Sequence, residues 1–173
     1  MTFSTTQALE ILERTPDALH TMLHQISEDW TYQNEGPDTW SVFDVVGHLL
    51  HGEKTDWIPR ATLILSDRAD KTFEPFDRFA QYETSKGKNI QTLLEEFRDA
   101  RKESLAELRR LNISDADLQK TGIHPTFGEV TLAQLLSTWV VHDLNHVSQI
   151  ARIMAKQYKE EVGPWTAFLR ILQ

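Results

Sequence analysis

Apolar residues recur every three or four positions over four long stretches, and this pattern constrains the fold of the chain most strongly. Such spacing gives a helix one apolar face, and four such helices can bury their faces together in a bundle. The predicted helices span about residues 4–30, 42–67, 89–111 and 131–158. No segment has a clear strand pattern. We therefore predict an all-α four-helix bundle, formed as a single domain by residues 1–173.

Two of the predicted helices begin with recognisable N-terminal signals. Ser41 is a plausible N-cap, and Asp44 adds an acidic side chain to the first turn that follows. Thr131 is followed three residues later by Gln134, which is the spacing of a capping box. Both signals lie directly before apolar stretches, so they support these two helix starts.

Proline and glycine mark the interruptions. Pro16 should kink the first helix or mark a later true start, and Pro59 should bend the second. A connection of about 20 residues, 68–87, separates the second and third helices. Connections this long tend to be functional or to cross over a bundle. Residues 121–128 read as a loop, and a break at 162–165 precedes a short final helix at 166–172.

Composition excludes several classes of function. The chain has no cysteine, which removes disulfides, thiolate metal sites and cysteine nucleophiles. Its formal charge is −8, and its Lys and Arg residues alternate with acidic ones, which argues against binding to nucleic acid. No apolar run is long enough to span a membrane, and the N-terminus lacks a signal-peptide pattern. We therefore expect a soluble, cytoplasmic protein.

Two pairs of histidines have the spacing of metal ligands on one helical face. His20 and His24 fall beside the apolar stripe of their helix, so we expect them to be solvated. His146 falls inside the apolar stripe of the fourth helix, and His142 lies at its edge. Buried imidazoles need partners for their nitrogens. The second pair therefore indicates either metal ligands or core histidines that are hydrogen-bonded to backbone or carboxylate groups.

A helical pair supplies two ligands, and a bound ion needs at least one more. The candidates for that ligand are His48, His51, Glu53, Asp56, His124 and Asp143. Position on the helix does not choose among His48, Glu53 and Asp56. Asp143 and Asn145 could instead orient an imidazole on another helix, or they could be polar residues at the edge of the bundle.

Two segments resemble the DinB-like superfamily of metal-binding four-helix bundles. Residues 138–150 resemble its last core helix, and residues 40–50 resemble its second, in which Trp40 precedes a histidine by about two turns. Further similarities lie at Glu53, at Arg60 and in the stretch 124–132. The resemblance covers nearly the whole chain. No single motif is very specific, but their order and spacing together are.

The resemblance implies an up-down-down-up bundle in which residues 68–87 form the crossover. It also implies that His48, His142 and His146 are the metal ligands, which settles the choice that periodicity leaves open. Zinc or nickel would suit three imidazole nitrogens and leave positions open for chemistry. Two classes of enzyme follow from the family: transferases that use a low-molecular-weight thiol, and hydrolases.

We prefer the thiol-dependent S-transferase slightly, with Glu53 or Asp56 as candidates for a general base. The alternative is a non-catalytic, metal-stabilised bundle that acts as a dimeric interaction module, and homodimerisation is implied only by the resemblance. Four tryptophans are compatible with a dimer interface, but the simpler interpretation is that they are core residues: Trp40, Trp57, Trp139 and Trp165. A role in binding DNA is disfavoured by the charge.

Overall fold

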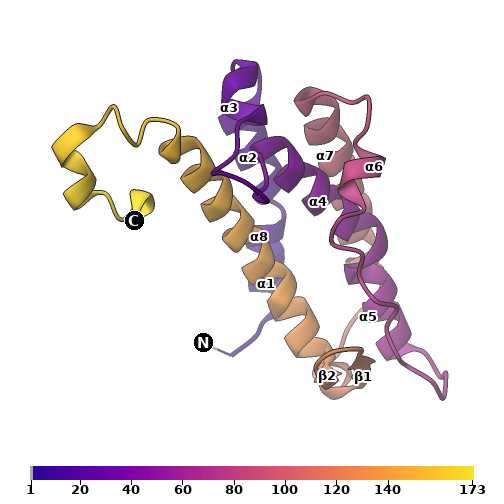
Figure 1. Ribbon diagram of the computed structural model, residues 1–173. Helices are drawn as coiled ribbons and strands as arrows, with labels where there is room; N and C mark the ends of the chain where they lie inside the picture. The colour runs from indigo at the N-terminus through magenta and orange to yellow at the C-terminus, as the bar shows by residue number, and fades with distance from the viewer. Residues whose placement is uncertain (1) are drawn as a thin grey trace.

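The computed structural model describes residues 2–173 and shows a four-helix bundle with an up-down-down-up course (Figure 1). The helices are α1 Thr5–Leu12, α2 Thr15–Leu23, α3 Glu28–Tyr32, α4 Val42–Thr55, α5 Trp57–Leu65, α6 Gln81–Thr84, α7 Ile90–Arg110 and α8 Leu132–Lys156. The bundle has four long helical segments, which we call its arms: α1–α3, α4–α5, α7 and α8. The first and second arms are each broken into shorter helices, and the third and fourth are single long helices. The 3-10 turns are η1 Asp117–Gln119, η2 Gly163–Phe168 and η3 Arg170–Leu172, and the strands are β1 Thr121–His124 and β2 Gly128–Thr131.

Both predicted N-terminal signals are present as capping boxes. At α4, the Ser41 hydroxyl accepts a hydrogen bond from the backbone amide of Asp44 at 3.2 Å. The Asp44 carboxylate in turn accepts one from the backbone amide of Ser41 at 2.9 Å. At α8, Thr131 and Gln134 make the same exchange, at 3.2 and 2.9 Å. These contacts satisfy amides that the helix itself leaves without acceptors, so they fix where the two helices of the candidate site begin.

The first two arms are more broken than the sequence predicts. Pro16 does mark a later start, because it lies in the first turn of α2, and α1 ends before it. In the second arm, the helix breaks at Asp56 instead of bending at Pro59. A proline ring clashes with the carbonyl four residues earlier, which here belongs to Thr55, so the interruption falls ahead of the proline.

A short β-hairpin occupies the stretch for which we predicted only a loop. Strands β1 and β2 pair in antiparallel register around a tight connection, in which Gly128 adopts a φ of +74°. The crossover then joins the hairpin: the amide of Phe73 donates to the carbonyl of Ile123 at 2.9 Å, and the amide of Ile123 donates to that of Lys71 at 2.9 Å. Four-residue strands are too short to show a periodic signal, and part of the hydrogen bonding of this hairpin is to the crossover, which is distant in sequence.

The core consists of two apolar clusters stacked along the bundle. One joins α2, α4, α7 and α8, and the other joins α1, α5, α7 and α8. Three charged residues, Glu53, Arg101 and Asp143, are buried at the level between them. Trp57 and Trp139 are core residues and lie parallel, 5.8 Å apart between ring centroids. Trp165 contradicts the core prediction, because 68% of it is exposed.

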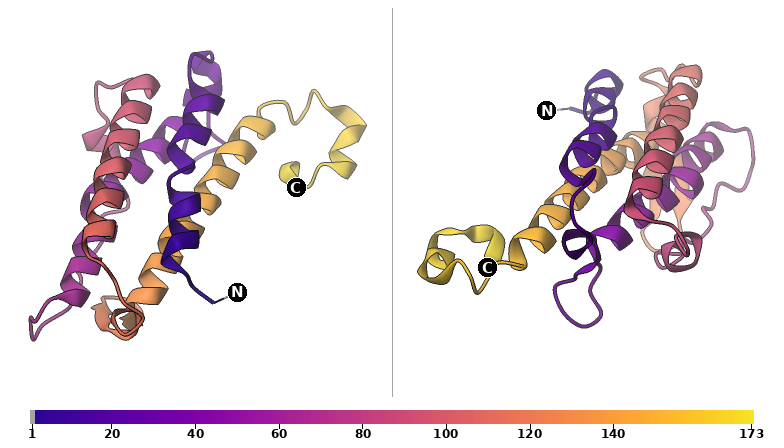
Figure 2. Two further views of the ribbon diagram at one scale, coloured as in Figure 1. Left: turned by 180° about the vertical axis from the view of Figure 1, so that it is seen from behind. Right: turned by 90° about the horizontal axis from the view of Figure 1, so that it is seen from above.

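Beyond the end of α8 the chain leaves the bundle and then turns back, so that η3 contacts α8 and Leu172 is buried (Figures 1 and 2). The residues of this segment form the turns η2 and η3 and not the helix predicted at 166–172. None of the helices within residues 2–173 has the length and apolar character required to cross a membrane.

Candidate metal centre

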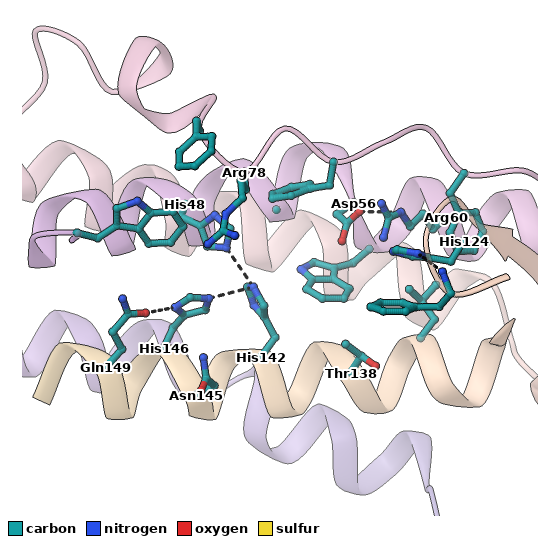
Figure 3. A pocket seen from close by; sticks show the side chains of 18 of the residues that line it. His48, Asp56, Arg60, Arg78, His124, Thr138, His142, Asn145, His146 and Gln149 are labelled. Atoms are coloured by element: carbon teal, nitrogen blue, oxygen red, sulfur yellow. Dashed lines mark hydrogen bonds and ion pairs between the residues drawn. The ribbon is translucent and has the colours of Figure 1, made fainter. Parts of the chain in front are cut away.

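Three imidazoles meet between the second and fourth arms of the bundle. His48 projects from α4, and His142 and His146 project from successive turns of α8 (Figure 3). The Nε2 atom of His142 lies 3.2 Å from that of His48 and 3.1 Å from that of His146. One ligating nitrogen from each residue lies within 4.8 Å of the others. The structure thus brings together the three histidines that the resemblance implies.

The separations between these nitrogens suit a shared metal ion. Two imidazole nitrogens held about 2.0–2.1 Å from one ion in tetrahedral geometry are themselves about 3.4 Å apart. The core-histidine alternative required hydrogen bonds to backbone or carboxylate groups. Instead, the buried Nδ1 atoms of His48 and His142 have no hydrogen-bond partner in residues 2–173. The donor set therefore fits a divalent ion better than it fits a hydrogen-bonded core.

Gln149 orients one of the three rings. Its side-chain oxygen lies 2.7 Å from Nδ1 of His146, where it can accept a hydrogen bond from a protonated Nδ1 and leave the lone pair of Nε2 facing the other histidines (Figure 3). Trp40 packs against His48 with ring centroids 4.7 Å apart. Sequence reasoning missed Gln149, although its spacing of three residues from His146 on one helix is a signal that could have found it.

Burial keeps these imidazoles in the neutral form that binds metals. Loss of solvation, followed by the nearby His146 and other positive groups, lowers the pKa of His48 from 6.5 to about 3. The pKa of His142 is lowered to about 3 for the same main reason. Burial also lowers the pKa of His146, against an opposing effect of Gln149. All three rings are thus neutral at pH 7, as ligation requires.

Glu53 points away from the histidines and into a buried ion-pair cluster, so it does not face the candidate site as a third ligand or a base would. Its Oε1 accepts a hydrogen bond from Arg101 at 2.8 Å and another from Nε1 of Trp139 at 3.0 Å. Burial raises the pKa of Glu53, and Arg101 opposes that rise. The structure therefore gives no support to the predicted role of Glu53 as a base, because Arg101 holds its carboxylate in the core and it does not line the cavity.

Asp143 belongs to the same cluster and binds no histidine. Its two oxygens accept hydrogen bonds from Arg101 at 2.7 and 2.9 Å, and its side chain is fully buried. Asn145 is exposed. Neither of the two therefore plays the orienting role that we considered, which Gln149 fills. Sequence reasoning also missed Arg101, which lies in the apolar stripe of α7 one turn after Phe97.

Asp56 remains a candidate for acid–base chemistry. It lines the same cavity as the three histidines, and its carboxylate lies 2.7 Å from the Nε of Arg60. Loss of solvation raises the pKa of Asp56 from 3.8 to about 6, and Arg60 opposes that rise. A carboxyl group with this pKa can take up or release a proton near neutral pH.

The other histidines lie outside the cluster. His51 is half-buried and packs against Phe76. His20 and His24 stack on each other with ring centroids 4.5 Å apart, and His24 is exposed, in line with the predicted solvation. His124 lines the cavity, and its Nδ1 accepts hydrogen bonds from two backbone amides of the turn that follows.

The three histidines open into a cavity of about 930 Å³. It runs between α4, α5 and α8, beneath the crossover and up to the hairpin. Its walls combine aromatic rings with a few charged groups. The aromatic residues are Trp40, Trp57, Phe73, Phe76, Phe79, His124 and Phe127. A cavity of this size and character suits a small organic ligand.

The family model described as the DinB superfamily matches residues 11–150. The chain belongs to the DinB superfamily. Within this fold, a similar solved structure is that of YfiT from Bacillus subtilis, described as a probable metal-dependent hydrolase with an unusual four-helix bundle topology. The two share 19% sequence identity, the match covers 90% of each chain, and the TM-score is 0.75. At this identity the likeness concerns the fold. A search of curated proteins found no match.

Proposed function

We propose that this DinB-superfamily protein is a metal-dependent enzyme that acts on a small organic molecule. His48, His142 and His146 would hold one divalent ion, with zinc or nickel as the best fit to three nitrogens. The observation that carries the proposal is the convergence of three neutral imidazoles at the wall of a cavity of about 930 Å³. A purely structural ion would instead be enclosed by protein ligands.

Such an ion, when bound, supplies a Lewis acid that promotes ionisation of water or of a small thiol. The protein's own residues then decide between the two reactions. A thiol-dependent S-transferase remains our preference, because the withdrawal of Glu53 into the core leaves few free bases, and a metal-activated thiol needs none. Soft thiol sulfur is also a preferred partner of zinc.

Hydrolysis is the second candidate, and Asp56 favours it. A carboxyl group whose pKa is about 6 could accept a proton from water at the cavity wall. The description of YfiT as a probable metal-dependent hydrolase supports the same reaction class. The non-catalytic dimeric module would need a closed metal site, and the open cavity argues for an enzyme.

The test begins with metal content, measured by mass spectrometry on untagged wild-type protein and on His48→Ala and His146→Ala. We expect about one ion per wild-type chain, lost in both variants while helical circular dichroism is retained. His24→Ala is a matched control that should keep the ion. Absence of metal from the wild type, even after zinc or nickel is added, would refute the proposal.

Turnover then distinguishes the reactions. The metal-loaded protein is incubated with electrophiles, with and without low-molecular-weight thiols, and with ester and amide substrates. Thiol consumption that requires both the metal and His146 would support the transferase. Hydrolysis without any thiol, lost in Asp56→Asn, would support the hydrolase instead.

A further inference from the structure

Two of the three arginines that line the cavity form ion pairs with protein carboxylates, and the third does not within residues 2–173. Arg152 is bound by Glu35 in a bidentate pair, with both hydrogen bonds 2.8 Å long. Arg60 is bound by Asp56 at 2.7 Å. Arg78 is the third arginine of the cavity wall, and it forms no ion pair within residues 2–173. One cation therefore faces the cavity without a protein anion.

Arg78 is held near the candidate metal centre by aromatic contacts. It lies on the crossover, and its guanidinium is 5.7 Å from the ring centroid of Trp40 and 5.3 Å from that of Phe79. Trp40 in turn packs against His48. Figure 3 shows the Arg78 side chain beside His48, across from His142 and His146. Stacking on aromatic rings leaves the edge of a guanidinium free to donate hydrogen bonds.

We propose that Arg78 is the binding site for a carboxylate carried by the ligand of this cavity. A planar guanidinium matches a carboxylate through two parallel hydrogen bonds. A singly charged carboxylate matches the one arginine of the cavity wall that has no ion-pair partner within residues 2–173, since Arg60 and Arg152 are already paired with Asp56 and Glu35. The aromatic wall around Arg78 would hold the apolar part of the same ligand.

This inference rests on the proposed function for its chemical meaning, because the carboxylate would be fixed beside the reacting centre. The carboxylate could belong to the thiol cosubstrate or to the molecule that the thiol attacks. Either source requires the same contact with Arg78. Binding measurements test this contact directly, and they do not require turnover.

The experiment measures binding by isothermal titration calorimetry with two matched pairs of probes. Phenylpropionate and phenylpropanamide have the same size and differ in having a charged carboxylate or a neutral amide, and mercaptopropionate and mercaptopropanamide form the corresponding thiol pair. The proteins are wild type, Arg78→Met, Arg78→Lys and the control Arg68→Met, an exposed arginine of the same crossover that lies outside the cavity wall. Each is titrated with and without added zinc, so that a carboxylate bound only to the ion is recognised.

We expect at least one acid to bind wild type about tenfold or more tightly than its neutral partner, without zinc as well as with it. Arg78→Met should abolish that preference, Arg78→Lys should retain part of it, and Arg68→Met should leave it unchanged. Preference for the thiol acid alone would assign the carboxylate to the thiol cosubstrate, and preference for phenylpropionate alone to the other substrate. Equal binding of acids and neutral partners, no binding of either acid, or a preference that survives in Arg78→Met would overturn the inference. If binding follows Arg78 but no turnover is found, only the proposed function fails.

Discussion

Replacing Arg101 with methionine should destabilise the protein severely, since this one side chain forms ion pairs with two buried carboxylates. Its side chain is 2% exposed, and its guanidinium donates to Asp143 at 2.7 and 2.9 Å, to Glu53 at 2.8 Å and to the carbonyl of Leu12 at 2.8 Å. Removal of one partner from a buried ion pair costs about 3–5 kcal/mol, because the remaining charge stays buried without compensation. Methionine keeps most of the apolar volume, so the loss reports mainly on charge and hydrogen bonding.

The pH dependence of that loss separates charge from packing. Burial already raises the pKa of Glu53, and removal of Arg101 should raise it further. A carboxyl group whose pKa is higher in the folded state than in the unfolded state stabilises the fold at low pH, and this stability is lost as the pH rises. The Arg101→Met variant should therefore lose less free energy of unfolding at about pH 5 than at about pH 8.

Urea denaturation followed by circular dichroism measures this difference, with Arg98→Met as the control. Arg98 is an exposed residue on the same helix, and its replacement should change the free energy of unfolding by less than about 0.5 kcal/mol. For a chain of this size, a loss of about 3 kcal/mol corresponds to a fall of roughly 6–12 °C in Tm. The reasoning would be refuted if Arg101→Met were no more harmful than Arg98→Met, or if its cost did not depend on pH.

Two further predictions concern the histidines. Gln149→Leu should weaken zinc binding about 10- to 100-fold, because His146 loses the acceptor that fixes its ring, and Ser148→Ala on the exposed face should leave affinity unchanged; competition with a zinc chelator measures both. In metal-free protein, the lowered pKa of His48 and His142 means that the unfolded chain binds more protons between pH 6.5 and about 3. The free energy of unfolding should therefore fall as the pH drops through that range, and His48→Phe should make the dependence shallower by up to about 1.4 kcal/mol per pH unit. An unchanged slope in urea titrations would contradict the assigned burial of His48.

Sequence periodicity recovered the parts of the fold that depend on local pattern. The third and fourth arms, the caps at Ser41 and Thr131 and the long crossover all follow from signals within a few residues of one another. The hairpin was missed because its four-residue strands are too short to show a periodic pattern, and the additional bridge to the crossover comes from about 50 residues away. Helix breaks were misplaced where a proline acts on the preceding turn, as Pro59 does on Thr55.

In the candidate site, too, contacts within one helix could be predicted from periodicity and contacts between helices could not. Spacing identified His142 and His146 as a pair on one face of a helix, but the third partner comes from another helix, and periodicity placed His48 only at the margin of its apolar face. The family resemblance supplied His48, since a recurrent pattern contains information about contacts between helices. Gln149 was missed because only the polar residues between the two histidines were considered as orienting groups, although its spacing of three residues from His146 places the two side chains side by side on α8.

The pairing of Glu53 with Arg101 could have been predicted from the sequence by considering the two buried charges together. Glu53 falls in the apolar face of the second arm, and Arg101 falls in the apolar stripe of α7, and each is unfavourable alone. Opposite charges on the buried faces of two helices in one bundle are expected to pair, because neither can be solvated. That expectation, which needs only the two helical patterns, removes Glu53 from the candidate catalytic bases. The proposed chemistry would then rest on Asp56 and on Arg78, which has no ion-pair partner within residues 2–173.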